Sequence, residues 1–260
     1  MLRSMYSGIS GMKNFQTKLD VIGNNIANVN TFGFKKGRAT FSDLVNQNIQ
    51  GAKASGGGIG GINPKQIGLG SSNSTIDTIH TQGSVQYTNR PLDLAISGDG
   101  FFVVSDGAND FYTRAGNFYL DGNGTLVNSD GLTLKPNINI PDDAQSFSID
   151  PTGAVSYINN AGALIPVDTL QIAKFANPGA LEKQGGNLFA ETTNSGAANI
   201  VDAAGEEGTG KLIIGGLEMS NVDLSEEFTE MITAQRGFQA NTKIITTSDE
   251  ILQELVNLKR

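Results

Sequence analysis

Few side chains in this sequence combine the type and the spacing that catalysis requires. His80 is the only histidine in the chain, and there is no cysteine. A Ser–His–Asp hydrolase would have to use His80 as its general base, yet this residue lies in the run Thr78–Thr81 with no such motif around it. We interpret His80 as an ordinary strand residue. The sequence predicts no catalytic residue, and we do not expect an enzyme.

Two loop sequences resemble ligand-binding motifs only superficially. The glycine cluster over residues 56–61 is not followed by Lys-Ser or Lys-Thr, as a phosphate-binding loop requires, so we interpret it as a flexible joint. The run Asp121–Gly124 begins like a calcium loop, but Leu132 occupies the position of the bidentate glutamate. A hairpin turn explains it better. We predict no metal site and no cofactor.

The composition limits the partners that the chain can have. A net charge of −8 argues against nucleic acid, whose binding draws on clustered lysine and arginine. No stretch approaches the roughly 18 apolar residues of a membrane span, so we expect no direct membrane insertion. Residues 1–29 are amphipathic, because Lys13, Lys18 and Asp20 interrupt any apolar core, and are not typical of a cleaved signal peptide.

Both ends of the chain carry apolar residues at heptad spacing. The repeat predicts a helix over residues 2–29, with the interface positions Met5, Met12, Phe15, Leu19, Ile22, Ile26 and Val29. It predicts a second helix from Asp223 onward, with the interface positions Leu224, Phe228, Met231, Phe238, Ile245, Leu252 and Leu255. A heptad stripe is apolar on one narrow face and needs a partner helix. We therefore expect the helices to pair as a coiled coil in one assembly domain, formed by residues 1–30 and 222–260.

Further apolar residues lie outside the two main stripes. Two helices alone could not bury Leu2, Ile9, Ile232, Ile244 and Ile251, so copies of the same chain are the natural cover. The alternative is that the stripes form the ordinary core of a helical hairpin in one folded monomer. That alternative is weaker because a separate β-rich region lies between the helices in the sequence.

Asparagine and glycine mark the end of the first helix, since both tolerate the left-handed conformation that stops helices. This joining-region motif comprises Asn24, Asn25, Asn28, Asn30, Gly33 and Phe34. Asp223 can cap the second helix, with Glu226 three residues later as in a capping box. Residues 31–70 lose the helical period, and we interpret them as an extended, Gly-rich joining arm, with residues 211–221 as the return segment.

The middle of the chain, residues 71–210, changes to a period of two. Short apolar runs such as Leu92–Ile96 and Phe101–Val104 are separated by turns rich in Asp and Gly. A spacing of roughly 8–12 residues between such runs is typical of antiparallel sheet, as a sandwich or barrel. Residues 185–210 are small and polar, and we predict a long loop there. The predicted fold class is α+β, with terminal helices and a central, antiparallel, all-β outer domain.

Four stretches of the sequence resemble the bacterial flagellar rod and hook proteins. They are Ser7–Met12, Asn24–Lys35, Arg90–Phe102 and Ala234–Asn241, which cover both ends and the middle in the same order. The resemblance implies an axial flagellar subunit in the hook or basal body, exported by the flagellar type III apparatus without a cleaved signal peptide. It implies a homopolymer that forms a hollow tube. The implied partners are neighbouring rod, hook-cap and hook–filament junction proteins and the export apparatus.

Within that family the sequence points in two directions. Residues 217–225 and 249–258 resemble hook protein more than distal rod protein, whereas the length suits distal rod and residues 63–70 suit both. We favour a compact hook protein, a flexible joint that transmits torque from rod to filament. The alternative is a distal rod protein, which acts as a drive shaft. A third reading, from another class, is a secreted β-domain adhesin with a helical stalk.

Overall fold

The computed structural model describes residues 2–54, 61–141, 144–160, 162–202, 204–205 and 208–258. The chain divides into two compact units. Unit 1 comprises Met1–Ile26, Gly37–Asp77 and Asp223–Arg260, and unit 2 comprises Ala27–Lys36 and Thr78–Val222. The chain therefore crosses between the units after residues 26, 36, 77 and 222. The flexible joint predicted at residues 56–61 falls almost entirely outside the described residues.

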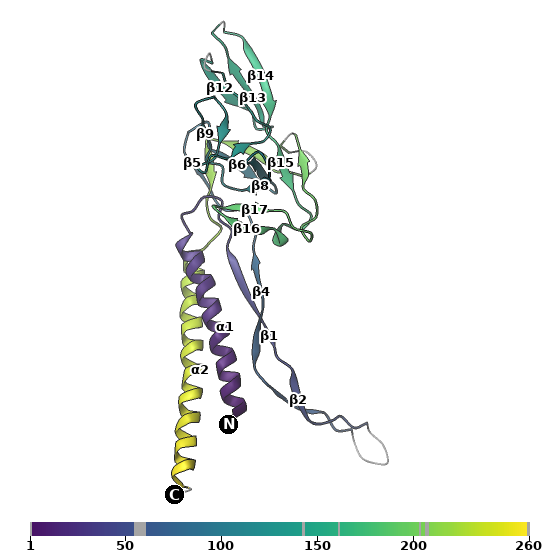
Figure 1. The fold of residues 1–260 in the computed structure, drawn as a ribbon, viewed down its shortest axis with the longest axis vertical. Coiled ribbons are helices and arrows are strands. Elements are labelled where there is room, and N and C mark those ends of the chain that lie inside the picture. The colour runs from purple at the N-terminus through teal and green to yellow at the C-terminus, as the bar shows by residue number, and fades with distance from the viewer. Residues whose placement is uncertain are drawn as a thin grey trace. The chain divides into compact units, whose positions relative to one another are not determined.

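Unit 1 is built on a pair of antiparallel helices (Figure 1). Helix α1 spans Leu2–Ala27, and helix α2 spans Leu224–Leu258. Gly8 lies against Ile245 near the start of α1, whereas Asn25 near its end is bonded to Glu227 at the start of α2. These contacts confirm that the two terminal helices pack together.

Local capping explains where the helices begin and end. Asp223 precedes α2, and its carboxylate accepts hydrogen bonds from the backbone N–H groups two and three residues later, at 2.8 and 3.4 Å. This is the N-cap role that the sequence predicts. Helix α1 ends at Ala27, before the predicted Val29, because the chain turns at Asn28, whose carbonyl accepts a bond from Thr31 N.

A ribbon of paired strands completes unit 1. It contains β1 (Gly37–Asp43), β2 (Asn46–Gln50), β3 (Lys65–Gly68) and β4 (Ser71–Thr78), with β1 paired to β4 and β2 to β3. Asn14 of α1 donates a hydrogen bond to the Ser71 hydroxyl at 2.8 Å. The rings of Phe15 and Phe41 meet edge to face, with centroids 6.3 Å apart. The segment predicted as an extended joining arm, residues 31–70, thus contains β1, β2 and β3, which were not predicted as strands because they are mostly polar and exposed.

Unit 2 is an antiparallel β region, as predicted (Figure 1). Its largest sheet has the order β16-β17-β8-β7-β11-β10-β9, and β15 joins it by pairing with β7 and β18. The remaining strands form β12-β13-β14, β6-β19 and β5-β20. The bounds are β5 Val85–Tyr87, β6 Leu94–Ser97, β7 Phe101–Ser105, β8 Asp110–Thr113, β9 Tyr119–Leu120, β10 Leu126–Val127, β11 Thr133–Leu134, β12 Ser146–Ile149, β13 Ala154–Ile158, β14 Leu164–Thr169, β15 Ile172–Lys174, β16 Glu182–Gly185, β17 Leu188–Ala190, β18 Asn199–Val201, β19 Lys211–Ile214 and β20 Gly216–Glu218, with a short 3₁₀ helix at Pro178–Ala180.

The core of unit 2 comes from the apolar runs that the sequence displays. The runs predicted around Leu94 and Phe102 become β6 and β7, and both side chains are fully buried. The prediction of a long loop over residues 185–210 was wrong in part. This segment contains β17 and β18, because Phe189 and Val201 are buried in the core.

The hairpin prediction at Asp121–Gly124 holds. These residues connect β9 to β10, and Gly124 N donates to the Asp121 carbonyl at 2.8 Å. Gly124 has a φ of +79°, and a Cβ there would collide with the Ile140 carbonyl. Glycine at this position is therefore a requirement of the turn.

Candidate functional site: the helix pair and the buried polar cluster

The predicted heptad positions of α1 and α2 differ in how far they are buried. Ile22 is only 2 % exposed. Further heptad residues are half-buried: Met5, Met12, Phe15, Leu19, Ile26, Met231, Phe238, Ile245 and Leu252. Ala234, which the heptad reading did not include, is 1 % exposed. Ile245 lies beside Gly8 and Phe15 lies beside Gly237, which places these two residues between the helices, in what we call the seam.

Two glycines allow a close approach of the helices. A Cβ added to Gly237 would lie 2.5 Å from the Phe15 ring, and one added to Gly11 would lie 2.8 Å from the Asn241 amide. Glycine inside a helix costs about 0.5–1 kcal/mol relative to alanine. The shortage of space explains why glycine is nevertheless found there. Sequence reasoning missed both positions, although each lies in a stretch that carries the family resemblance.

A buried polar contact joins the end of α1 and the start of α2 to β1. Asn25 and Glu227 are 2 % and 5 % exposed, and Asn25 Nδ2 donates to Glu227 Oε2 at 3.1 Å. Asn25 also exchanges two hydrogen bonds of 2.9 Å with the backbone of Gly37. Of the predicted joining-region motif, Asn25 therefore ties three elements together, whereas its neighbour Asn24 is exposed.

Other apolar residues of the helices remain on the surface of unit 1. They are between 38 and 59 % exposed: Ile9, Leu224, Phe228, Ile232, Ile244, Ile251 and Leu255. Leu224, Phe228 and Leu255 were predicted interface positions, and their interface role stays a prediction. Val29, another predicted position, follows the end of α1. A helix pair normally buries such residues against another surface.

The rest of the joining-region motif lies in unit 2. Gly33 has a φ of +69°, and a Cβ there would lie 2.5 Å from Ala115 N. Phe34 is buried, with Lys183 Nζ 5.2 Å from its ring centroid. Asn30 lines a cavity of about 190 Å³. These residues of the motif therefore pack closely against the β region of unit 2.

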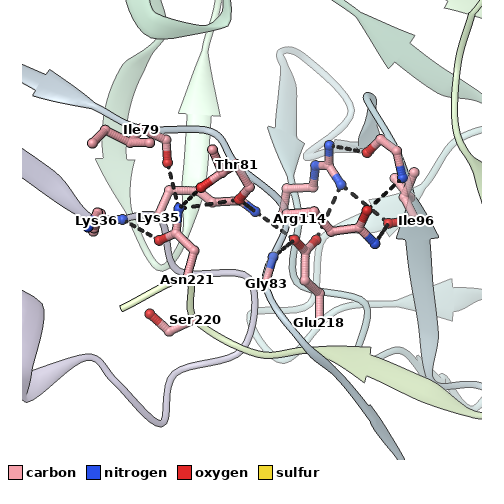
Figure 2. Close-up of polar contacts among 12 residues, drawn as sticks. Lys35, Lys36, Ile79, Thr81, Gly83, Ile96, Arg114, Glu218, Ser220 and Asn221 are labelled. Carbon is pink, nitrogen blue, oxygen red and sulfur yellow. Dashed lines mark hydrogen bonds and ion pairs between the residues drawn. The ribbon is translucent and has the colours of Figure 1, made fainter. Parts of the chain in front are cut away.

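Three ionised side chains are buried together in unit 2 (Figure 2). Lys35 Nζ lies 2.6 Å from Glu218 Oε1, and Arg114 Nη1 lies 3.2 Å from Glu218 Oε2. All three side chains are at most 3 % exposed. Burial lowers the pKa of both Lys35 and Arg114, while Glu218 acts in the opposite direction. Such a cluster requires precise hydrogen bonding, since buried charges are costly to desolvate.

Asn221 connects three chain segments beside this cluster (Figure 2). Its Oδ1 accepts a hydrogen bond from Lys36 N at 2.8 Å, and its Nδ2 donates to the Ile79 carbonyl at 2.8 Å. Nδ2 also lies within hydrogen-bond distance of Thr81 O and Oγ1, at 3.2 and 2.9 Å. This cluster was not predicted from the sequence, although Lys35 ends the stretch Asn24–Lys35 that carries the family resemblance.

His80 is half-buried near the same cluster, with both ring nitrogens shielded from solvent. Its ring lies 5.6 Å from the Phe101 ring and 5.4 Å from the Phe189 ring, and neither of its nitrogens has a hydrogen-bond partner among the described residues. Burial first, and then the positive charges of nearby Lys35, Arg114 and Lys183, lower the pKa of His80 to about 4. The backbone of Pro178 acts in the opposite direction but is outweighed. His80 is therefore neutral at pH 7 and packs as an aromatic core residue.

In the described portion of the chain, no group of three or more His, Asp or Glu side chains is placed to hold a metal ion. No helix in that portion is long and apolar enough to cross a membrane. The structure has a helix pair with exposed apolar residues, and it has a β-rich unit 2 whose entering and leaving segments are hydrogen-bonded to one another.

Comparison with known families decides the class. Residues 5–35 match the flagella basal body rod protein family, and residues 215–258 match the flagellar basal body rod FlgEFG protein C-terminal family. Residues 95–157 match the flagellar hook protein FlgE/F/G D1 domain. The flagellar basal-body rod protein FlgG of Bacillus subtilis is 63 % identical over 100 % of both chains. The chain belongs to the flagellar rod and hook protein family.

This flagellar protein has relatives of both kinds. FlgG of Agrobacterium fabrum is 42 % identical, over 96 % of this chain and 97 % of the relative. The flagellar hook protein FlgE of Borreliella burgdorferi is 32 % identical over 442 aligned positions that include all of both chains. The chain is thus a structural protein of the flagellar axis, as the resemblance implied, and its location is the flagellum.

The preference for a hook protein needs correction. The comparisons support the distal rod alternative better, because identity is 63 % with a rod protein and 32 % with a hook protein. The hook reading relied on residues 217–225 and 249–258, which lie in or beside α2. Rod and hook proteins share the family match over residues 215–258, so this part of the sequence discriminates poorly between them.

Proposed function

We propose that this chain is the distal rod subunit of the bacterial flagellum, which polymerises helically into a hollow shaft that transmits torque. The observation that carries the proposal is the 63 % identity to a basal-body rod protein along the full length of both chains. The alignment with the hook relative spans 442 positions for a chain of 260 residues, so that relative contains much additional sequence. Chain length and identity therefore favour the rod.

The helix pair supplies the polymerising surface in this proposal. Leu224, Phe228 and Ile232 follow one another at intervals of four residues and are all at least 40 % exposed. Ile251 and Leu255 repeat that interval near the end of α2 and are each 49 % exposed. Residues four apart lie on one side of a helix. These two patches are apolar surfaces that neighbouring copies of the subunit would cover, as a helical assembly requires.

The partners follow from that role. The subunit contacts its own copies along the shaft, other rod proteins at one end and hook proteins at the other. It reaches the shaft through the flagellar export apparatus. No nucleic acid or membrane insertion is part of this proposal.

Immunogold labelling of isolated hook–basal bodies tests the proposal. An epitope inserted in the exposed turn over residues 106–109, between β7 and β8, leaves the helix pair unchanged. We expect gold only over the rod, in preparations from motile cells, with untagged cells as the control. Gold along the curved hook would instead assign the chain to the hook.

A further inference from the structure

Three of the four chain crossings between the two units are connected to one another inside unit 2. We use the name crossing segments for residues 33–36, 79–83 and 218–221, which adjoin the crossings after residues 36, 77 and 222. These segments are far apart in the sequence but lie side by side in the structure (Figure 2). Two separate layers of contacts hold them together.

The first layer is a closed ring of hydrogen bonds. Lys36 N donates to Asn221 Oδ1 at 2.8 Å, and Asn221 Nδ2 donates to the Ile79 carbonyl at 2.8 Å. Ile79 N in turn donates to the Lys36 carbonyl at 2.9 Å. Each residue belongs to a different crossing segment. The amide of Asn221 can serve both neighbours because it carries an acceptor and two donors.

The second layer is the buried charge cluster. Lys35 Nζ is bonded to Glu218 Oε1 at 2.6 Å and to the Thr81 carbonyl at 2.8 Å, which again joins all three segments. Gly83 N also donates to Glu218 Oε1, at 2.9 Å. Glu218 is only 1 % exposed. A charged, directional contact of this kind fixes geometry more strictly than an apolar contact would.

Arg114 anchors the second layer to the β sheet. Its Nη1 contacts Glu218 Oε2 at 3.2 Å, and its Nη2 donates to the Gly98 carbonyl at 2.7 Å. Arg114 directly follows β8, which pairs with β7 in the largest sheet. The crossing segments are therefore bonded to one another and, through Glu218, to the core of unit 2.

We propose that Lys35, Glu218 and Asn221 form a clasp that makes a force arriving along any one crossing segment act on all three. Hydrogen bonds loaded together resist far better than bonds opened one after another, as in the peeling of a single terminal segment. The clasp thus protects the chain ends of unit 2 from being pulled off the sheet. The proposal rests on the proposed function, in which the subunit transmits torque.

Hydrogen exchange on the purified full-length subunit tests the clasp itself. In Asn221→Ala, we expect the backbone amides of Lys36 and Ile79 to exchange about tenfold faster, because the ring is opened. The amides of β7 should keep their protection, which shows that unit 2 is still folded. Asn159→Ala is the matched control, since Asn159 Oδ1 also accepts a backbone hydrogen bond, from Ala163 N, in the turn between β13 and β14.

Three results of this exchange experiment overturn the clasp. They are unchanged exchange at Ile79 in Asn221→Ala, equal acceleration there in the Asn159→Ala control, and loss of β7 protection in step with Ile79. Glu218→Gln provides a second variant with nearly unchanged side-chain volume. It should accelerate exchange at Gly83, whose N–H is bonded to Glu218.

A test under load separates the clasp from the proposed function. Cells carrying Asn221→Ala should swim like the parent in dilute medium but shed broken flagella several-fold faster in viscous medium. Equal shedding by variant and parent overturns the mechanical role, even if the exchange experiment succeeds. Electron microscopy of the break then tests the other proposal. A break within the rod agrees with a rod subunit. Increased breakage within the hook would agree with the clasp proposal but contradict the rod assignment.

Discussion

At the scale of single residues, the cluster around Glu218 carries more positive than negative charge. Glu218 faces two cations, Lys35 and Arg114, and all three side chains are buried. Burial lowers the pKa of both cations, and the carboxylate of Glu218 acts in the opposite direction on each. One carboxylate therefore holds two costly charges in place.

Removing that carboxylate should be strongly destabilising. We expect Glu218→Ala to lower the free energy of unfolding of unit 2 by about 3–5 kcal/mol, because the buried Lys35 and Arg114 both lose their ion-pair partner. Chemical denaturation of the full chain, followed by circular dichroism, measures this loss. The control is Asp110→Ala, which breaks the half-exposed pair with Lys135 and should cost at most about 1 kcal/mol. Equal losses in the two variants would contradict the assignment.

His80 should make unit 2 sensitive to acid. Its pKa is lowered from 6.5 to about 4, first by burial and then by neighbouring cations. The unfolded chain therefore takes up the proton before the folded chain does as the pH falls. The stabilisation is complete above pH 6.5 and is lost progressively toward pH 4, by up to about 3 kcal/mol.

Replacement of His80 by phenylalanine isolates this effect. Phenylalanine suits a site between Phe101 and Phe189 and cannot be protonated. We expect His80→Phe to reduce the slope of unfolding free energy against pH between 6.5 and 4, measured by denaturation at a series of pH values. Identical slopes in parent and variant would show that His80 does not titrate in this range.

At the scale of elements, the helix seam combines predictable and unpredictable parts. The heptad repeat predicted both helices, because the period of apolar residues is a local property of the sequence. It did not distinguish the buried Ile22 from the exposed Phe228. Gly11 and Gly237 were not predicted, since the need for glycine arises from Asn241 and Phe15 on the opposite helix.

Two glycine substitutions should have opposite effects on the stability of the helix pair. Gly237→Ala places a Cβ 2.5 Å from the Phe15 ring, and the resulting overpacking should destabilise the helix pair by about 1–3 kcal/mol. Gly23→Ala meets no atom within 4 Å and should stabilise α1 by about 0.5–1 kcal/mol. The temperature at which assembled polymers lose their helical circular dichroism reports both changes. Shifts of the same sign would argue against close packing at Gly237.

The strands and the buried charge cluster also differ in how far they could be predicted. Apolar runs are a local property of the sequence, whereas the cluster joins residues that are far apart in it. Strands β6 and β7 were predictable because their apolar runs end at Gly and Asp turns. The ribbon strands β1, β2 and β3 were not, because their residues are mostly polar and partly exposed. Lys35 and Glu218 are separated by 183 residues, so no local pattern could reveal their contact.

At the scale of the whole molecule, polymerisation should depend on the helices, and folding of unit 2 should not. The terminal helices belong to unit 1, whereas the clusters that form the apolar core are built from residues of unit 2. We predicted three regions: residues 1–30 with 222–260, residues 31–70 with 211–221, and residues 71–210. That division into domains stays a prediction.

Deletion variants test that independence. Removing residues 1–29 or 224–260 should abolish tube formation by the purified protein, as measured by sedimentation and electron microscopy. The β-sheet circular dichroism of unit 2 should persist, because its core is intact. Tubes formed by a protein that lacks both segments would rule out the helix pair as the polymerising surface.

Electron cryotomography of cells that lack this gene tests the central claim, that the chain is the distal rod subunit. The rod subunit must be present before a hook can be built on it. We predict basal bodies with a truncated rod and no hook, and a complete structure when the gene is restored. A full-length rod that ends without a hook would contradict the rod assignment and identify the chain as the hook protein.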